Sequence, residues 1–154
     1  MGSNLDDLYR DIIMDHYKYP RGKGKLEDPS VSNEGKNPVC GDEISVSVKF
    51  DGSFVSDVSV DCLGCAISVA SGSMLAETLK GKSIDEVKKL ASVVRSLLKG
   101  EKPGEKIDLG DLESLEGVGK FPVRIKCALL SWTTLIDGIE AWEKGKVIHT
   151  SSTE

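Results

Sequence analysis

Apolar and polar residues follow a helical period at the start of the chain. Apolar residues recur there at steps of three and four, which is the spacing of one face of an amphipathic helix. The helix is expected to follow the cap residue Asn4 and to end at Pro20. Its predicted apolar stripe comprises Leu5, Leu8, Tyr9, Ile12, Ile13 and His16.

The next strong pattern has a period of two and predicts a β-hairpin. Residues 44–50 alternate between apolar and polar, as a strand with one buried face does. Asp51-Gly52 is a two-residue turn signal, and residues 55–60 form the second strand, with the alternation slipping once near Asp57. A third strand within 25–34 is left open.

Helical patterns dominate the remainder of the chain. The segment 65–80 carries apolar residues on one side. Ser83 and Glu86 form a capping box that opens a second helix. A proline at the first position of 122–143 is suited to the first turn of a long final helix.

Three segments lack a clear pattern. Residues 25–39 are rich in Gly, Pro, Ser and Asn and are interpreted as a surface loop. Residues 101–119 are polar, with at most a short helix around 109–115, and the tail 145–154 is expected to be loose.

The order of elements predicts a single α+β domain over 1–154, in which helices pack on one face of a small antiparallel sheet of about three strands.

Composition narrows the classes of function. The chain has 154 residues, 39% of them hydrophobic, and a net charge of −5, which fits one domain whose core needs no disulfides. The acidic balance predicts no nucleic-acid partner, and the short apolar stretches predict no membrane partner. We see no secretory signal pattern and therefore expect a cytoplasmic protein with reduced thiols.

Three points along the chain carry thiol chemistry. Cys40 precedes the hairpin, Cys65 begins the helix after it, and Cys127 lies near the start of the last helix. If the helices pack on one face of the sheet, these points meet at one end of it. Gly41 lets the backbone turn so that Cys40 and Asp42 face the same centre. Three thiolates and a carboxylate offer four ligands, as tetrahedral zinc requires, and the harder carboxylate is the position at which such a site can open.

The position of two of these cysteines predicts thiolate character. A cysteine near a helix N-terminus lies at the positive end of the helix dipole, which lowers its pKa. Cys65 and Cys127 both occupy such positions, and Arg124 and Lys126 would add to the effect.

Each cysteine also has an ordinary alternative interpretation. A free cysteine often packs as a small hydrophobe, and the spacing matches no zinc-finger template. Cys62 and Cys65 have the spacing of a redox pair, but we see no thioredoxin-like unit around them. His16 is expected to be packed or half-exposed, and His149 to be solvated, rather than to bind metal. From the residues alone, a metal or sulfur site and a set of packed thiols both remain open.

The segments around these residues resemble the IscU/SufU (NifU N-terminal-like) family of iron–sulfur cluster assembly proteins over nearly the whole chain. The first helix of the family is matched by LYRDIIMDHY at 8–17. The three ligand loops are matched in order by NPVCGD at 37–42, GCAISVAS at 64–71 and FPVRIKC at 121–127. The resemblance implies that zinc or a transient [2Fe–2S] cluster is bound by Cys40, Asp42, Cys65 and Cys127.

The resemblance also implies the source of sulfur. A cysteine desulfurase would deliver it as a persulfide to Cys40, whose thiolate must leave the metal to attack the sulfur. Recipient apoproteins or a downstream Suf scaffold would receive the product. The chain would then be an assembly scaffold or a sulfur-transfer protein rather than a conventional enzyme.

Two features resemble the SufU branch more closely than IscU. Lys126 stands where IscU has a histidine before the last cysteine, and 101–119 resembles the SufU insert. The IscU chaperone motif Leu-Pro-Pro-Val-Lys is replaced by residues 121–124, which leaves binding of a dedicated Hsp70 chaperone open. Cys62 falls where the family has no ligand, and we interpret it as packing.

Three functions remain alternatives at this point. They are a cluster scaffold, a strictly zinc-dependent persulfide sulfurtransferase with no scaffold role, and a structural zinc-binding interaction domain.

Overall fold

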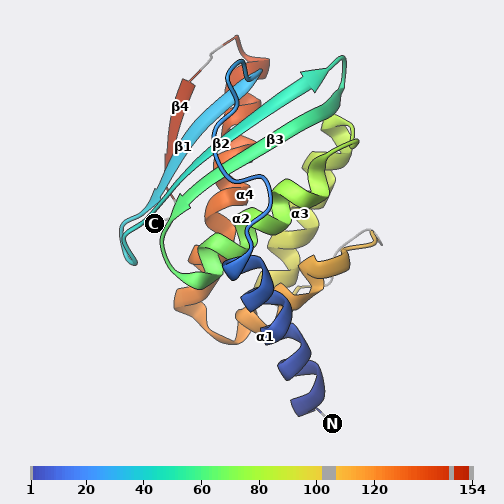
Figure 1. Ribbon diagram of the computed structural model, residues 1–154, viewed down its shortest axis with the longest axis vertical. Helices are drawn as coiled ribbons and strands as arrows, with labels where there is room; N and C mark the ends of the chain where they lie inside the picture. Colours follow the sequence, from blue (N-terminus) through green and yellow to red (C-terminus); the bar gives the residue numbers. More distant parts are fainter. Residues whose placement is uncertain (1, 102–106, 146–147, 153–154) are drawn as a thin grey trace.

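Strands with alternating polarity form a sheet that packs against helices (Figure 1). The computed structural model describes residues 2–101, 107–145 and 148–152. The elements follow in the order α1 (Gly2–Lys18), β1 (Val31–Asn37), β2 (Asp42–Asp51), β3 (Phe54–Leu63), α2 (Ala66–Leu79), α3 (Ile84–Lys99), the 3₁₀ helix η1 (Gly110–Lys120), α4 (Pro122–Glu143) and β4 (Ile148–Ser152). This is the predicted α+β class, with helices against a sheet in which the predicted three antiparallel strands are joined by a fourth.

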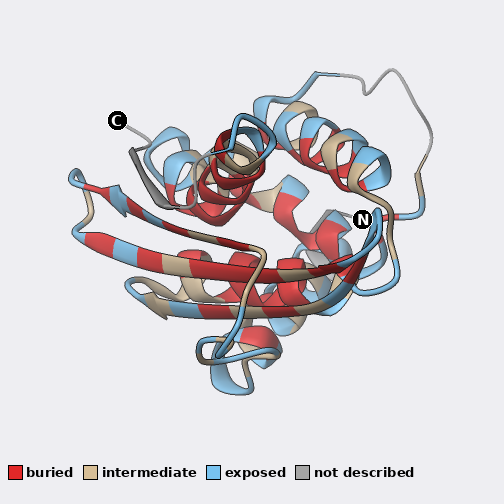
Figure 2. Ribbon diagram, turned by 90° about the horizontal axis from the view of Figure 1, so that it is seen from above, coloured by how far each residue is buried: buried red, intermediate tan, exposed pale blue. Residues whose placement is uncertain are grey.

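The sheet has the strand order β3-β2-β1-β4. Strands β1, β2 and β3 are antiparallel neighbours, whereas β4 lies parallel to β1. Buried and exposed residues alternate along the strands, as Figure 2 shows. The register shifts between Lys49 and Phe50, because Lys49 pairs with Asp57 and Phe50 with Val55. The predicted slip near Asp57 is therefore a β-bulge.

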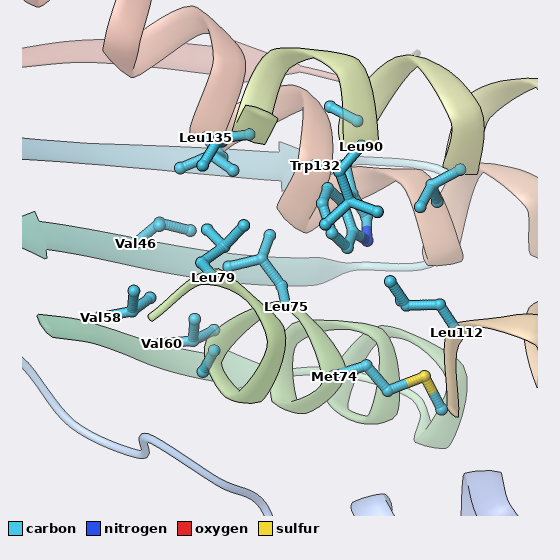
Figure 3. Close-up of a cluster of buried hydrophobic side chains, with 14 of the residues drawn as sticks. Val46, Val58, Val60, Met74, Leu75, Leu79, Leu90, Leu112, Trp132 and Leu135 are labelled. Carbon is cyan, nitrogen blue, oxygen red and sulfur yellow. The ribbon is translucent and has the colours of Figure 1, made fainter. Parts of the chain in front are cut away.

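Helices α2 and α4 lie directly against the sheet, and the core fills the space between these layers. Figure 3 shows valines of β2 and β3 facing leucines of α2, with α3 and α4 closing the cluster. Trp132 of α4 is only 2% exposed, and Trp142 packs its ring against Phe50 at a centroid distance of 4.8 Å. Among the described residues, no helix is long and apolar enough to cross a bilayer.

The helix boundaries agree well with the predictions, apart from the first helix. The capping box is present, with reciprocal hydrogen bonds between Ser83 and Glu86, and α4 begins at the predicted proline. Helix α1 begins at Gly2, before the predicted cap Asn4. The first part of its apolar stripe is not buried, since Leu5 is 47% and Leu8 54% exposed.

The prediction of a loop over 25–39 was wrong in part, because β1 lies within it. Apart from Val31, the buried positions of this strand are Asn33, Gly35 and Asn37, and α4 approaches them closely. A Cβ at Gly35 would lie 2.0 Å from Thr134 Oγ1, and the Asn33 side-chain amide donates to the Thr134 carbonyl at 2.9 Å. A strand buried in this way shows no apolar alternation.

The tail 145–154 was expected to be loose, but it contains strand β4, which pairs with β1 through the backbone. Residues 146–147 and 153–154 of that tail lie outside the described residues. So do residues 102–106 of the predicted insert, whose later part forms η1.

Candidate metal and sulfur site

The turn between β1 and β2, at one end of the sheet, carries the first cysteine of the site. Asn37 ends β1 and pairs with Asp42, which begins β2, and the turn between them holds Cys40. The backbone N–H groups of Cys40 and Gly41 donate to the Asn37 carbonyl at 3.2 and 2.8 Å. Gly41 has φ 75°, a left-handed conformation that glycine adopts without strain. The turn therefore presents Cys40 and Asp42 to one centre, as predicted.

Helices bring the other two cysteines to this end. Cys65 follows β3 and is the N-cap residue of α2, and Cys127 lies in the second turn of α4. The sulfur of Cys127 lies 3.4 Å from that of Cys40. Ligand atoms of Cys40, Asp42 and Cys127 all lie within 4.8 Å of one another, and the Cys65 sulfur lies 3.9 Å from Asp42 Oδ2. The structure thus brings together the four residues that the sequence singled out.

The carboxylate of Asp42 is 1% exposed and is held by the start of α2. Its Oδ1 accepts a hydrogen bond from the Cys65 backbone N–H at 3.0 Å, and its Oδ2 accepts one from Ser68 Oγ at 2.6 Å. A Cβ at Gly64 would lie 2.4 Å from Oδ1. Glycine at this position therefore leaves the space that the carboxylate fills.

Burial governs the electrostatics of Cys127. It raises the pKa of this thiol well above its ordinary value, and the hydrogen bond with Cys40 adds to the effect. The predicted lowering of its pKa by the helix terminus was therefore wrong in the absence of a cation, because loss of solvation outweighs the dipole. The Arg124 guanidinium lies beside the sulfurs of Cys65 and Cys127. Negative charge on Cys65, and then a hydrogen bond to Cys127, raises the pKa of Arg124.

Cys62 packs against the core from β3, as predicted. Burial is the largest cause that raises its pKa, to about 12, and Asp42 adds to the effect. His16 is also buried, but it belongs to another part of the molecule. Its ring nitrogens contact Ser73 Oγ at 2.7 Å and Asp111 Oδ2 at 2.9 Å.

Two polar residues of the site were missed by the sequence reasoning. Ser68 contacts Asp42, and the Asn37 side-chain amide donates to the Cys127 sulfur at 3.6 Å. Asn37 Oδ1 is buried without a hydrogen-bond partner among the described residues. Both residues lie inside the segments that resemble ligand loops, and the position of Ser68 three residues after Cys65, on the same helix face, was a signal for its role.

The donor set fits a thiophilic metal. Three sulfurs and one carboxylate oxygen supply the soft ligands and the number of donors that zinc takes in proteins, and a [2Fe–2S] cluster also prefers thiolates. Because Gly64 has no side chain, the Asp42 carboxylate has room to lie among the cysteines without any change of the backbone.

Comparison with known proteins decides the family. Residues 8–143 match the model of the NifU-like N terminal domain. The chain belongs to this family. It is 47% identical to the zinc-dependent sulfurtransferase SufU of Bacillus subtilis (strain 168), over 93% of this chain and 97% of that protein. It is 40% identical to the iron–sulfur cluster assembly scaffold protein IscU of Streptococcus pyogenes serotype M1, over 90% of this chain and 86% of that one.

The fold of this NifU-like domain is also that of a solved relative. A crystal structure described as an iron–sulfur cluster assembly scaffold protein of the SUF system, from Fervidobacterium islandicum AW-1, superposes with a TM-score of 0.75 at 33% identity. The match covers 83% of this chain and 93% of that one. The resemblance to the IscU/SufU family is thus confirmed, and the chain is a member of an iron–sulfur cluster assembly family.

Exposed apolar side chains surround the site of this NifU-like domain. Val39, Leu63, Phe121 and Val123, here called the apolar rim, are between 59% and 75% exposed. Cys40 lines a shallow pocket of about 420 Å³ together with Phe121, Val123 and Arg124. The site therefore opens to the surface at Cys40, whereas Cys127 is fully buried.

Proposed function

We propose that this protein is a zinc-dependent sulfur carrier of iron–sulfur cluster biogenesis, which accepts sulfur on Cys40 from a cysteine desulfurase. The observation that carries the proposal is the convergence of Cys40, Asp42 and Cys127 within 4.8 Å, with the Cys65 sulfur 3.9 Å from Asp42. These four residues would hold the zinc ion. When bound, zinc supplies positive charge that keeps the buried thiols deprotonated.

Sulfur transfer would use Cys40, because it lines a surface pocket and is partly exposed, whereas Cys127 is buried. Its thiolate attacks the terminal sulfur of a persulfide on the desulfurase. The new bond joins Cys40 Sγ to that sulfur, and the bond to the desulfurase cysteine breaks and leaves a thiolate there. The exchange needs no external oxidant or reductant. Arg124, which lines the same pocket, supplies a positive charge beside the reacting sulfur.

The desulfurase would dock on the apolar rim. Exposed large apolar side chains grouped around a reactive residue are typical of a protein contact surface. The exposed side chains of Arg124 and Lys126 add positive charge at the same end of α4. Recipient apoproteins or a downstream Suf scaffold would then approach the same opening. We place this chemistry in the cytoplasm, where the four cysteines, all free thiols here, stay reduced.

A scaffold that builds a [2Fe–2S] cluster is the second candidate. It is supported by the 40% identity to an IscU scaffold protein and by the carboxylate, since a single harder ligand lets bound cargo leave. Lys126 favours the carrier. It stands where the IscU branch has a histidine that can itself bind metal, and a protonated lysine cannot do so. A purely structural zinc domain is disfavoured by the opening at Cys40.

The metal and acid-labile sulfide content of the protein, purified without oxygen, tests the proposal. It is measured before and after reaction with a cysteine desulfurase, cysteine and ferrous iron. A sulfur carrier retains zinc and gains persulfide without cluster absorbance. Iron and sulfide in near-equal amounts, transferable to an apoprotein, would establish a scaffold instead.

A further inference from the structure

We propose that Ser68 is a positioning residue that orients the Asp42 carboxylate toward the metal and thereby sets the zinc affinity of the site. The inference rests on the proposed function in one respect, namely that Asp42 is a zinc ligand. Ser68 lies in the first turn of α2 and is 1% exposed, so water does not compete for its hydroxyl group.

The hydroxyl group of Ser68 contacts three of the four site residues. It lies 2.6 Å from Asp42 Oδ2, 3.6 Å from the Cys65 sulfur and 3.3 Å from the Cys127 carbonyl oxygen. A serine has a single hydroxyl proton, so it can make one strong donation. The shortest of the three distances, and the negative charge of the acceptor, assign that proton to Asp42.

The two oxygens of Asp42 are therefore held by two different groups of α2. The Cys65 backbone N–H fixes Oδ1, and the Ser68 hydroxyl fixes Oδ2. Two hydrogen bonds to two oxygens define the plane of the carboxylate, whereas one bond would leave it free to rotate. Each oxygen keeps a further lone pair, so a carboxylate held in this way can still bind a cation.

The functional consequence is preorganisation. Hydrogen-bond partners that orient a metal ligand commonly contribute 10–100-fold to metal affinity. Removal of the Ser68 hydroxyl should therefore weaken zinc binding through Asp42, although Ser68 itself is no ligand. A merely structural serine would alter the stability of the metal-free fold and leave zinc binding unchanged.

Ser71 provides a matched control. It lies one turn further along α2 and is also fully buried, but its hydroxyl donates to the Ala128 carbonyl at 2.6 Å and accepts from the Trp132 indole N–H at 3.2 Å. Its replacement removes the same buried group from the same helix without touching a site residue.

The test is competition for zinc alone between the protein and a chromophoric chelator, with the Ser68→Ala, Ser71→Ala, Asp42→Ala and Ser68→Ala/Asp42→Ala variants. Ser68→Ala is expected to raise the zinc Kd by about 10–100-fold, whereas Ser71→Ala changes it less than about threefold. In the Asp42→Ala background, loss of the Ser68 hydroxyl should have almost no further effect, because the residue through which it acts is gone. Melting of each metal-free variant shows that it is folded.

An unchanged zinc Kd in folded Ser68→Ala would overturn the inference. So would an equal loss in the presence and absence of Asp42, since Ser68 would then act through the cysteines. Ser68→Thr keeps the hydroxyl and should restore affinity; a threonine variant as weak as the alanine one, with an equal metal-free melting temperature, also contradicts the inference. Failure of the wild-type protein to bind zinc at all would instead refute the proposed function.

Discussion

The Asp42 carboxylate accepts a hydrogen bond from the backbone N–H of Cys65 at 3.0 Å, so a predicted metal ligand also caps helix α2. The first N–H groups of a helix have no partner within the helix, and a side-chain oxygen that accepts from them stabilises its start. The Cys65 side chain makes no such cap itself. Assembly of the site and formation of the first turn of α2 therefore depend on the same contact.

This double role separates two substitutions of Asp42. Asp42→Ala removes both the ligand and the cap and should lower the free energy of unfolding of the metal-free protein by about 1 kcal/mol. Asp42→Asn keeps a capping oxygen and should cost much less stability while still weakening zinc binding. Urea denaturation in the presence of a chelator measures the difference, and equal stability of the two variants would show that the cap contributes nothing.

Cys62 should react with alkylating agents much more slowly than Cys40 at neutral to mildly alkaline pH. With a pKa of about 12, only roughly one part in ten thousand of this thiol is ionised at pH 8, and the thiolate is the nucleophile. Limited alkylation of the metal-free protein, followed by peptide mass spectrometry, should modify Cys40 well before Cys62. Modification of Cys62 first would be incompatible with its packed position.

The same thiol makes stability depend on pH in the alkaline range. Its pKa is raised from 9.0 in the ordinary thiol to about 12 in the fold, so the folded state keeps the proton that the unfolded state loses. This contribution is complete below pH 9 and is lost as the pH rises towards 12. Cys62→Ala should therefore reduce the alkaline fall in the unfolding free energy by up to about 1.4 kcal/mol per pH unit, as measured by urea denaturation. An identical slope in both proteins would contradict the assigned burial.

His16 should act as a buried anchor for η1 rather than as a metal ligand. The Asp111 carboxylate can only accept, so the hydrogen bond at 2.9 Å assigns a proton to His16 Nε2. In the neutral ring of that tautomer, Nδ1 accepts from the Ser73 hydroxyl, whose oxygen also accepts from the Arg21 backbone N–H at 2.8 Å. His16→Ala removes both ring contacts and leaves a cavity, and should cost about 2–4 kcal/mol of stability.

The control for His16 removes only one partner. Asp111→Asn keeps an acceptor on a side chain that is 47% exposed and should cost less than about 1 kcal/mol. Urea denaturation of the metal-free variants gives both values. A loss below about 1 kcal/mol for His16→Ala would mean that the ring is dispensable. His16, Glu77 and Asp111 lie close enough together to resemble a metal site. Arg21 Nε lies 3.2 Å from Glu77 Oε2, so the positive charge beside these carboxylates is already supplied by an arginine.

The elements that could be predicted from the sequence are those whose burial is apolar. Period-two valines identified β2 and β3, and the capping box and the proline identified α3 and α4. Strand β1 overlaps the third strand that was left open within 25–34, and it gave no firm signal because Asn33 and Gly35 are buried against Thr134 through a hydrogen bond and a close backbone approach. Strand β4 was missed because its pairing with β1 depends on main-chain hydrogen bonds, which carry no side-chain pattern.

The site residues show the same distinction between positions that a sequence pattern predicts and contacts that depend on the packed fold. The positions of Cys40, Cys65 and Cys127 relative to the elements predicted that they meet at one end of the sheet if the helices pack on one of its faces, and the family resemblance supplied their role as ligands. The position of Ser68, three residues after Cys65, was a signal for its place near the site. The hydrogen bonds that Ser68 and Asn37 make could not be predicted, because they depend on how α2 and α4 pack against the turn between β1 and β2. The pKa of Cys127 was predicted in the wrong direction, since its burial is a property of the packed fold.

The central claim is that Cys40 accepts sulfur at a site that holds zinc, and peptide mass spectrometry tests it most directly. The zinc-loaded protein is reacted with a cysteine desulfurase and cysteine, alkylated, and digested without reductant, with Cys40→Ser and Cys62→Ser as paired variants. We expect one added sulfur atom on the Cys40 peptide, lost in Cys40→Ser and retained in Cys62→Ser, with zinc still bound to the reacted protein. Added sulfur on Cys62 alone, or transfer that continues in Cys40→Ser, would contradict it.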